Sequence, residues 1–199
     1  MTGVSRRFVL LLPLAAAACV TEVDDTPTVF EPLTFDYLTK LRLSVARVDV
    51  DDSWRPGPES RDIGYLSPVA PVAVLREMAE QRLLPGGGPG RGVLVIDRAS
   101  LVLAQGSYVG EFAVHLDVLD DAGARVGFAE ARVSRSATAH DDGAARMRAA
   151  LYQLTRRLMD DMNVELEFQI RRSLKDLLQT AASTAPVPGR VDAQDLPPP

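Results

Sequence analysis

Hydrophobic residues recur with two different periods between residues 40 and 178, and each period predicts its own type of element. Alternate apolar positions indicate strands, because successive side chains of a strand point to opposite faces. Apolar positions three and four apart indicate amphipathic helices. In chain order, the pattern predicts a strand at 41–50, a helix that begins at Pro68 or Pro71 and ends at Pro85-Gly86, strands at 93–104, 112–118 and 128–137, and a helix at 143–179.

The first strand and the two helices carry further detail. The alternation in 41–50 changes phase near Val45, which predicts a β-bulge there. The segment 51–62 contains two prolines and a glycine and is predicted to be a loop. The apolar stripes comprise Val72, Leu75, Met78, Ala79 and Leu83 in the first helix, and Met147, Leu151, Leu154, Leu158, Met162, Leu166, Ile170, Leu174 and Leu177 in the second.

Asp120-Asp121-Ala122-Gly123 predicts a hairpin turn, and the faces of the flanking strands restrict its register. A slip of one residue swaps the faces of a strand, so a loop of three residues would set apolar side chains against Glu130 and Arg132. We therefore expect a loop of two or four residues. This places Phe112, Val114 and Leu116 opposite Ala129, Ala131 and Val133, and a two-residue turn places His115 opposite Glu130.

The element order predicts an α+β domain with a mainly antiparallel sheet of about four strands, in the order β-α-β-β-β-α. We expect both helices on one face of the sheet, because that packing buries both apolar stripes. The other face carries polar side chains and would meet solvent or a partner. Along the chain we expect a signal peptide at 1–18, a lipidated tether at 19–32, a single domain at 33–180 and a disordered proline-rich tail at 181–199.

The N-terminus has the pattern of a bacterial export signal. Arg6 and Arg7 precede an apolar run too short for a transmembrane helix, and four alanines and the only cysteine, Cys19, follow. The segment 16–19, Ala-Ala-Ala-Cys, resembles a lipobox, in which cleavage between Ala18 and Cys19 leaves a cysteine acylated with diacylglycerol and palmitate. Ordinary cleavage after Ala18 is the alternative, and it would leave one unpaired thiol. We expect lipidation, because it explains both why the cysteine stands at the cleavage position and why the chain has no second cysteine.

The export route and the target membrane stay open. Ser5-Arg6-Arg7-Phe8 resembles a twin-arginine export motif, and ordinary export is the alternative. Val20 is not the aspartate that marks inner-membrane retention in enteric bacteria, which favours the outer membrane. In either case we expect a periplasmic protein that its lipid anchors to a bacterial membrane.

Composition limits the partners of the mature protein. The full chain has a net charge of −5, and removing residues 1–18 takes away Arg6 and Arg7 and no acidic residue, so the net charge becomes −7. An acidic chain without a polybasic patch argues against binding to nucleic acid or to anionic lipid head groups. We expect no cofactor and no metal, and an envelope protein as the partner.

Two histidine segments are candidates for chemistry. His115 and Asp117 share a strand face, and the carboxylate of Glu130 beside the imidazole would favour its protonated form, as in a proton switch or a catalytic base. The alternative, which we favour, is an exposed polar pair across two strands. The segment His140-Asp141-Asp142 could touch a metal, but three adjacent residues fit tetrahedral geometry poorly, so we expect a helix-capping loop.

The polar strand face and the loop at 51–62 together give a candidate partner surface. Trp54 and Tyr65 border that loop and could anchor a partner, or could equally pin the loop onto the core. The glycine-rich segment 84–91 follows a helix and lacks the lysine of a phosphate loop, so we interpret it as a flexible connector. The candidate surface comprises Trp54, Tyr65, Glu111, His115, Glu130 and Arg132.

Several short segments carry a resemblance. They are Pro68-Val69-Ala70-Pro71, Arg82-Leu83, Val95-Ile96, Ala99-Ser100 and, most clearly, Leu154-Thr155-x-x-Leu158-Met159-x-Asp161-Met162-Asn163-x-Glu165-Leu166-Glu167-x-Gln169-Ile170. Together they resemble a family of small, uncharacterised lipoproteins from alphaproteobacteria, over residues 40–178. The resemblance implies no catalytic residue. More loosely, the layout is similar to envelope lipoproteins that accompany transport machines.

These observations lead to three functional hypotheses. The first is a non-enzymatic binding or assembly component of an envelope complex. The second is a carrier of an apolar, lipid-like ligand between the sheet and the helices, because Met147, Met159 and Met162 suit an adaptable apolar surface. The third is an enzyme of unknown type, which would need His115 or His140 beside two carboxylates in a deep pocket.

Overall fold

The structure, a computed structural model, describes residues 27, 29–139 and 143–179. Its elements are β1 (Leu41–Leu43), β2 (Arg47–Asp51), η1 (Gly64–Leu66), α1 (Pro71–Arg82), β3 (Leu83–Pro85), β4 (Arg91–Ala104), β5 (Ser107–Leu119), β6 (Arg125–Thr138), α2 (Ala144–Ser173) and η2 (Lys175–Leu177). Strands β2, β4, β5 and β6 form, in that order, a sheet that is parallel at β2–β4 and antiparallel elsewhere. Strands β1 and β3 form a small parallel sheet. The predicted α+β class is confirmed.

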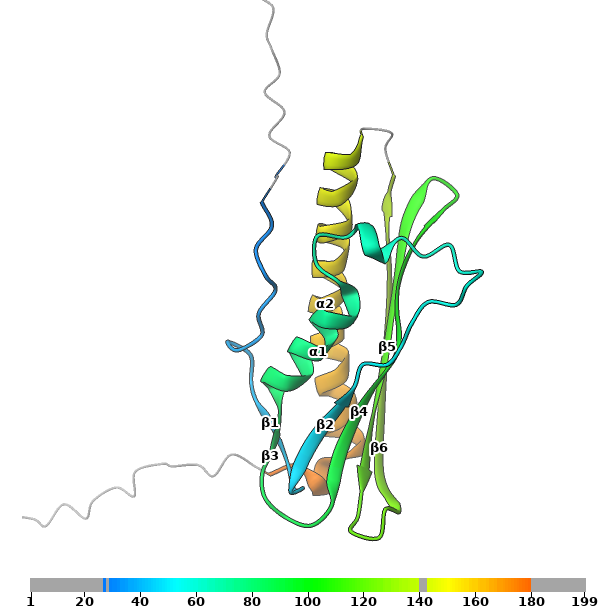
Figure 1. The fold of residues 1–199 in the computed structure, drawn as a ribbon. Helices are drawn as coiled ribbons and strands as arrows, with labels where there is room; N and C mark the ends of the chain where they lie inside the picture. The colour runs from blue at the N-terminus through cyan, green and yellow to red at the C-terminus, as the bar shows by residue number, and fades with distance from the viewer. Residues whose placement is uncertain (1–26, 28, 140–142, 180–199) are drawn as a thin grey trace, which may run out of the picture.

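Both α-helices pack on one face of the four-stranded sheet, as predicted (Figure 1). Helix α2 lies along β5 and β6, while α1 lies over β2 and β4. Apolar side chains from the inward-facing positions of the strands meet those of the helices in one buried core. Burial of this apolar surface is the main contribution to the stability of the fold. Fully buried members include Leu75, Met78, Leu94, Leu101, Phe112, Leu116, Leu158 and Met162.

Helix α1 begins at Pro71, one of the two predicted prolines. Proline suits this first helical position because its missing N–H would have no helical partner there. The helix buries Leu75 and Met78, as predicted. Val72, which was expected in the stripe, is only half-buried at the margin of the core. Val74 is buried instead, because it stands four residues before Met78 on the same helical face.

The hairpin of β5 and β6 has the register that the alternation of faces predicts. The cross-strand pairs are Phe112–Val133, Val114–Ala131, Leu116–Ala129 and His115–Glu130. The connecting loop is longer than the predicted two or four residues, because it spans five residues, 120–124. Val126 is unpaired and forms a bulge in β6. Because of this extra residue, the inward-facing side chains of β6 still stand opposite those of β5 despite the odd loop length.

The predicted single strand at 41–50 is wrong. The chain turns sharply at Val45, whose N–H donates to the carbonyl oxygen of Leu43 at 2.8 Å, so β1 and β2 enter different sheets. A bulge would have kept both halves in one sheet. Val45 itself is fully buried, which fixes this turn to the core. The change of phase in the sequence therefore marks a turn between two strands.

The second predicted helix is also shorter than expected, because α2 ends at Ser173. The chain then turns back along β1. Ser44 N–H donates to the carbonyl oxygen of Leu177 at 2.7 Å, and Gln179 N–H donates to that of Arg42 at 2.9 Å. These hydrogen bonds hold the end of the chain beside the small sheet, out of line with the helix.

The chain before β1 runs along the helices (Figure 1). The rings of Phe30 and Tyr152 lie 5.1 Å apart, and the Tyr152 hydroxyl donates to the carbonyl oxygen of Glu31 at 3.1 Å. Phe35 is buried, and its N–H donates to Oε1 of Gln81 at 2.5 Å. The N-terminal segment is thereby attached to both helices.

Candidate partner-binding site

The outer face of the four-stranded sheet brings together the four charged or polar residues of the predicted partner surface. Glu111 and His115 of β5 and Glu130 and Arg132 of β6 stand at positions that face away from the helices. Arg132 lies 4.0 Å from Glu111 and 3.5 Å from Glu130. These side chains form an array of both charge signs at the surface.

His115 has a different partner from the one predicted. Glu130 stands opposite it in the register, but the Glu130 carboxylate lies beside Arg132. Nδ1 of His115 lies 2.7 Å from Oδ2 of Asp97, and Nε2 lies 3.8 Å from Oδ2 of Asp117. Asp97 reaches His115 because β4 has a bulge at this residue. The sequence pattern missed Asp97, since a bulge interrupts the alternation that the pattern relies on.

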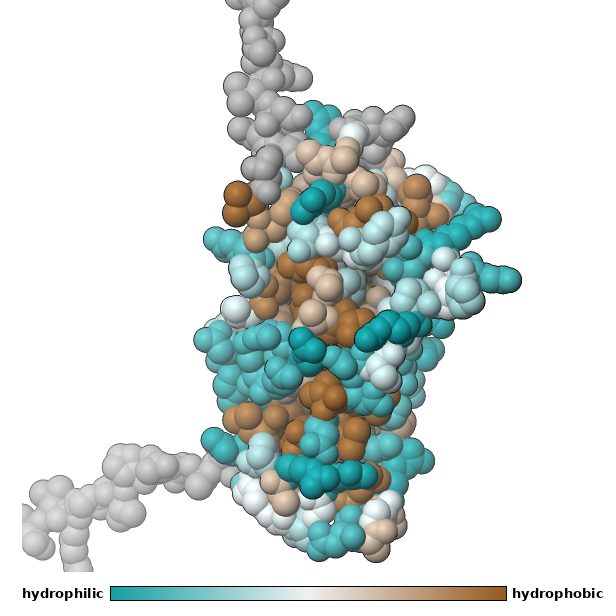
Figure 2. Space-filling model, viewed as in Figure 1, coloured by the Kyte–Doolittle hydropathy of each residue, from teal (hydrophilic) through white to brown (hydrophobic). Residues whose placement is uncertain are grey.

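Trp54 and Tyr65 line a separate, apolar pocket beside the start of α1. The pocket has a volume of about 540 Å³, a size typical of ligand-binding sites. Figure 2 shows apolar side chains gathered around the start of α1, with polar side chains protruding at the edge of the molecule. Trp54 is half-buried against the core, whereas Tyr65 is 81% exposed. Trp54 therefore packs as the loop-pinning alternative requires, and the exposure of Tyr65 leaves both of its alternatives open. The lining also includes Pro56, Pro71, Val72, Ala73 and Ala99.

The loop after β2, which forms one wall of this pocket, is held at both ends. At its start, Arg76 of α1 forms an ion pair with Asp52 at 2.7 Å. At its end, the Asp62 carboxylate accepts hydrogen bonds from Gly64 N–H at 2.8 Å and from Leu101 N–H at 3.0 Å. These contacts fix the wall of the pocket at both ends of the loop.

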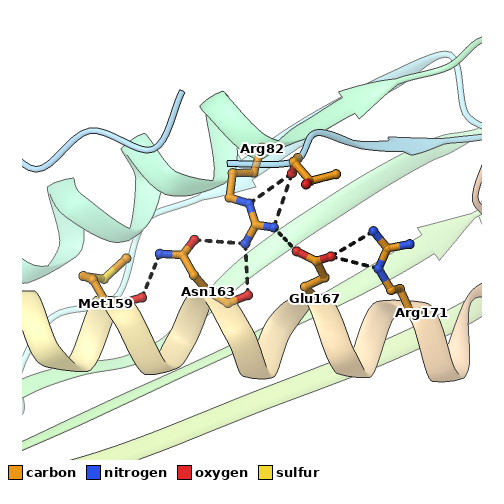
Figure 3. Close-up of polar contacts among 6 residues, drawn as sticks. Arg82, Met159, Asn163, Glu167 and Arg171 are labelled. Carbon is orange, nitrogen blue, oxygen red and sulfur yellow. Dashed lines mark hydrogen bonds and ion pairs between the residues drawn. The ribbon is translucent and has the colours of Figure 1, made fainter. Parts of the chain in front are cut away.

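A buried polar cluster, which the sequence pattern did not predict, joins α1 to α2 (Figure 3). Arg82 is 2% exposed, and its Nη1 donates to Oδ1 and to the carbonyl oxygen of Asn163, each at 3.0 Å. Its Nη2 forms an ion pair with Glu167, and Nε and Nη2 donate to the carbonyl oxygen of Thr39 at 3.3 Å. Glu167 also accepts from Arg171 at 2.8 Å. The cluster therefore connects three segments that are distant in the sequence.

One signal in the sequence could have revealed this cluster. Arg82 follows Met78 by four residues and Ala79 by three, so it lies on the buried face of α1. Charged residues are rarely buried without a partner, so an arginine at this position implies acceptors on the element packed against it. Asn163 and Glu167 of α2 supply them.

Ion pairs shift the pKa of two acidic groups on α2. Desolvation alone would raise the pKa of Glu167, but the hydrogen bonds from Arg171 and Arg82 outweigh it and lower this pKa below its ordinary value. The pKa of Asp161 is lowered by its hydrogen bond from Arg135 of β6. Both carboxylates are therefore ionised at neutral pH, and they fasten α2 to α1 and to β6.

Several predicted sites lie outside the described residues. They are the cleavage and lipidation residues Ala18 and Cys19 and the segment His140-Asp141-Asp142. Within residues 29–139 and 143–179, no group of three or more His, Cys, Asp and Glu side chains could hold a metal ion. None of the helices described is both long and apolar enough to span a bilayer.

No family model matches the sequence, and no curated protein matches it. Among solved structures, the chain is similar to a Xanthomonas campestris protein of the DUF330 family, with 9% identity, a TM-score of 0.42, and coverage of 74% of this chain and 95% of that one. It is also similar to a protein described as a lipoprotein from Caulobacter crescentus, with 17% identity, a TM-score of 0.28, and coverage of 63% and 91%. A third is a minor lipoprotein from Acinetobacter baumannii, with 12% identity, a TM-score of 0.31, and coverage of 64% and 94%. At these values the three structures assign the chain to no family, and they do not restrict its resemblance to alphaproteobacteria.

Proposed function

We propose that this protein is a lipid-anchored periplasmic component of a bacterial envelope complex, and that its domain binds a partner protein at the pocket of Trp54 and Tyr65. The observation that carries the proposal is the exposed Tyr65 side chain at the rim of a preformed apolar pocket. Tyrosine and tryptophan beside apolar pockets are typical anchors of protein interfaces. The lipobox-like segment ending in Cys19 supports the anchor, and Val20 favours the outer membrane.

The proposed role needs no catalytic group, because binding uses surface that is already in place. The pocket supplies apolar contact, and the outer sheet face with Glu111, His115, Glu130 and Arg132 supplies a second, polar surface for a partner. Charges at such a surface contribute to the rate and specificity of association more than to affinity. The partner expected is accordingly a protein with an exposed apolar side chain that fills the pocket.

Cross-linking in intact cells tests this proposal. The full chain and its Tyr65→Ala variant are cross-linked, purified in detergent, and compared for the partners recovered. Tyr37→Ala is the matched control, because Tyr37 is also exposed, at 73% against 81% for Tyr65. We expect the parent and the control to recover the same envelope protein, and Tyr65→Ala to recover at least about tenfold less. Equal recovery with Tyr65→Ala, or no reproducible partner for the parent, would contradict the proposal.

The alternative function is carriage of an apolar ligand. In this fold its binding site would be the pocket at Trp54, in place of the predicted position between the sheet and the helices. Met159 and Met162 are fully buried, and a Cβ at Gly110 would collide with Leu158, so α2 lies directly on β5 at this point. The pocket at Trp54 is apolar and large enough for a small ligand. Native mass spectrometry of the membrane-purified chain would show this function as a retained ligand mass that Tyr65→Ala reduces.

A further inference from the structure

Strand β6 is a long free edge of the four-stranded sheet. Within the residues described, it pairs only with β5, and it spans 14 residues. The opposite edge, β2, has five residues. An edge strand presents backbone N–H and C=O groups that have no partner in the sheet, and such an edge can pair with another strand. Of the two edges, β6 offers almost three times the length.

The space beside this edge is open. A hollow of about 410 Å³ lies along Phe128–Arg132, and Glu165, Gln169 and Ser173 of α2 form its other wall. Phe128 is 41% exposed there, although aromatic side chains are usually buried. The hollow therefore leaves space beside β6 at this point, between the strand and the side chains of α2. Addition of a strand to such an edge is a common mode of recognition.

We infer that β6 pairs edge to edge, antiparallel, with the β6 strand of a second copy of this chain, centred on Ala131. With this centre, Glu130 faces Arg132 of the second copy, and Arg132 faces the second copy's Glu130. The two side chains already lie 3.5 Å apart within one chain and are exposed, at 49% and 61%, so the new strand pair would extend this ion pair to the second copy. Opposite charges directly across two antiparallel strands stabilise their pairing. Two such pairs form, because a twofold axis repeats each contact.

The other possible centres fit the sequence less well. Paired residues must share a face, so the axis passes beside one residue of β6 and its own copy. A centre on Glu130 or on Arg132 would set like charges against each other, which is destabilising. A centre on Ala129 would shorten the overlap, and a centre on Ala129 or on Val133 would separate Glu130 from Arg132. Only the centre on Ala131 sets opposite charges across the axis, and its regular overlap spans residues 127–135, from the bulge at Val126 onward.

The remaining cross-strand neighbours are compatible with this register. Phe128 faces Ser134 of the second copy on the outer side of the sheet. On the inner side, Arg135, which pairs with Asp161 of α2, faces Gly127, over which Leu174 and Leu177 of the second copy lie. No pair of like charges is opposed anywhere in the overlap. The two sheets thus form one continuous sheet of eight strands, with both α2 helices on the same face.

Charge reversal at the central pair tests the inference. Sedimentation of the full chain in density-matched detergent is compared for the parent, for Glu130→Arg and for Arg132→Glu. Each single variant sets four like charges together at the axis, so we expect its dimer to be roughly tenfold or more weaker than that of the parent. A mixture of the two variants restores opposite charges across the axis, so we expect it to form a dimer as stable as that of the parent. Lipid-driven sharing of a micelle would not depend on these charges.

Arg47→Glu is the matched control. Arg47 lies on the opposite edge, is 61% exposed like Arg132, and also pairs with an acidic residue two positions along its own strand. We expect this variant to dimerise like the parent, and thermal unfolding checks that each variant is folded. A monomeric parent, or single variants that dimerise as the parent does, would overturn the inference. If the parent is monomeric and Glu130→Arg loses a different captured protein, the edge serves a strand of that protein, which also overturns it.

Discussion

At the scale of single residues, the guanidinium group of Arg82 joins α1, the chain before β1 and the middle of α2. It donates hydrogen bonds to Thr39, Asn163 and Glu167 from a position that is 2% exposed. A buried charge is tolerated only while its partners satisfy it, and the partners depend on it in the same way. The orientation of α1 against α2 therefore depends on this side chain as well as on the shared apolar core.

Removal of the Arg82 side chain is expected to destabilise the fold. Arg82→Ala leaves the Glu167 carboxylate with Arg171 alone and removes the Arg82 donor from three further acceptors, so we expect the free energy of unfolding to fall by about 3–5 kcal/mol. Arg171→Ala is the control, because Arg171 binds the same carboxylate but is 54% exposed. We expect that variant to lose less than about 1 kcal/mol. Urea denaturation of the full chain measures both, and losses of equal size would contradict the account of the cluster.

The lowered pKa of Glu167 predicts a dependence of stability on pH. A carboxyl group whose pKa is lower in the folded than in the unfolded state stabilises the fold above its unfolded pKa, which is about 4.3. That stabilisation is lost as the pH falls through the lower, folded pKa. We therefore expect the difference in unfolding free energy between the parent and Glu167→Gln to be constant above about pH 5 and to shrink below about pH 4.

Denaturation at a series of pH values between neutral and acid checks this expectation. The unfolding free energies of the parent and of Glu167→Gln are compared at each pH, so that the other carboxyl groups cancel. A difference that stays constant, or that grows as the pH falls, would show that the Glu167 carboxylate is not stabilised by its arginine partners.

At the scale of elements, Gly110 sets how closely α2 approaches the sheet. A Cβ at this position would collide with Leu158 Cδ1 and lie 2.9 Å from Leu101 Cδ2, and both leucines are fully buried. Gly110→Ala gains about 0.5–1 kcal/mol of strand propensity, but overpacking of a closed core costs about 1–3 kcal/mol. We expect net destabilisation, with a lower urea midpoint.

Gly57→Ala provides the comparison, because a Cβ at Gly57 would have no atom within 4 Å. We expect its urea midpoint to equal or slightly exceed that of the parent. If Gly110→Ala were as stable as Gly57→Ala, the helix and the sheet would not be in the close contact described.

Local pattern was sufficient for some elements and not for others. The start of α1 at one of two prolines follows from proline chemistry, and the pairing of Leu116 with Ala129 follows from the alternation of faces. The break at Val45 does not, because it depends on hydrogen bonds to distant segments, such as that of Ala46 N–H to the Gly90 carbonyl oxygen at 3.1 Å. The bulge at Asp97 likewise escapes a pattern that assumes regular alternation.

At the scale of the whole molecule, the candidate site was only partly predictable. Trp54 and Tyr65 stood out because aromatic residues flank a loop rich in proline and glycine. The pocket that they share also needs Val72 and Ala99, which the fold brings together from α1 and β4. Side chains that are distant in the sequence create such a concave surface, so no local spacing could have revealed it.

The attachment of the N-terminal segment limits how far the domain could move from the proposed lipid anchor. Phe30 and Glu31 contact Tyr152 of α2, which fixes the chain from this point onward. The ten peptide steps from Cys19 to Val29 span at most about 35 Å. With a lipid on Cys19, the domain would therefore stay close to the membrane surface, where an envelope partner would meet it.

The most direct test of the account is the mass of the N-terminal peptide of the chain purified from bacterial membranes. The account predicts a peptide that begins at Cys19 and carries a diacylglycerol group on sulfur and an additional acyl chain. It also predicts that Cys19→Ala, when exported, is lost from the membrane fraction. A peptide that begins at Cys19 with a free thiol, or a Cys19→Ala variant that stays on membranes as the parent does, would contradict it.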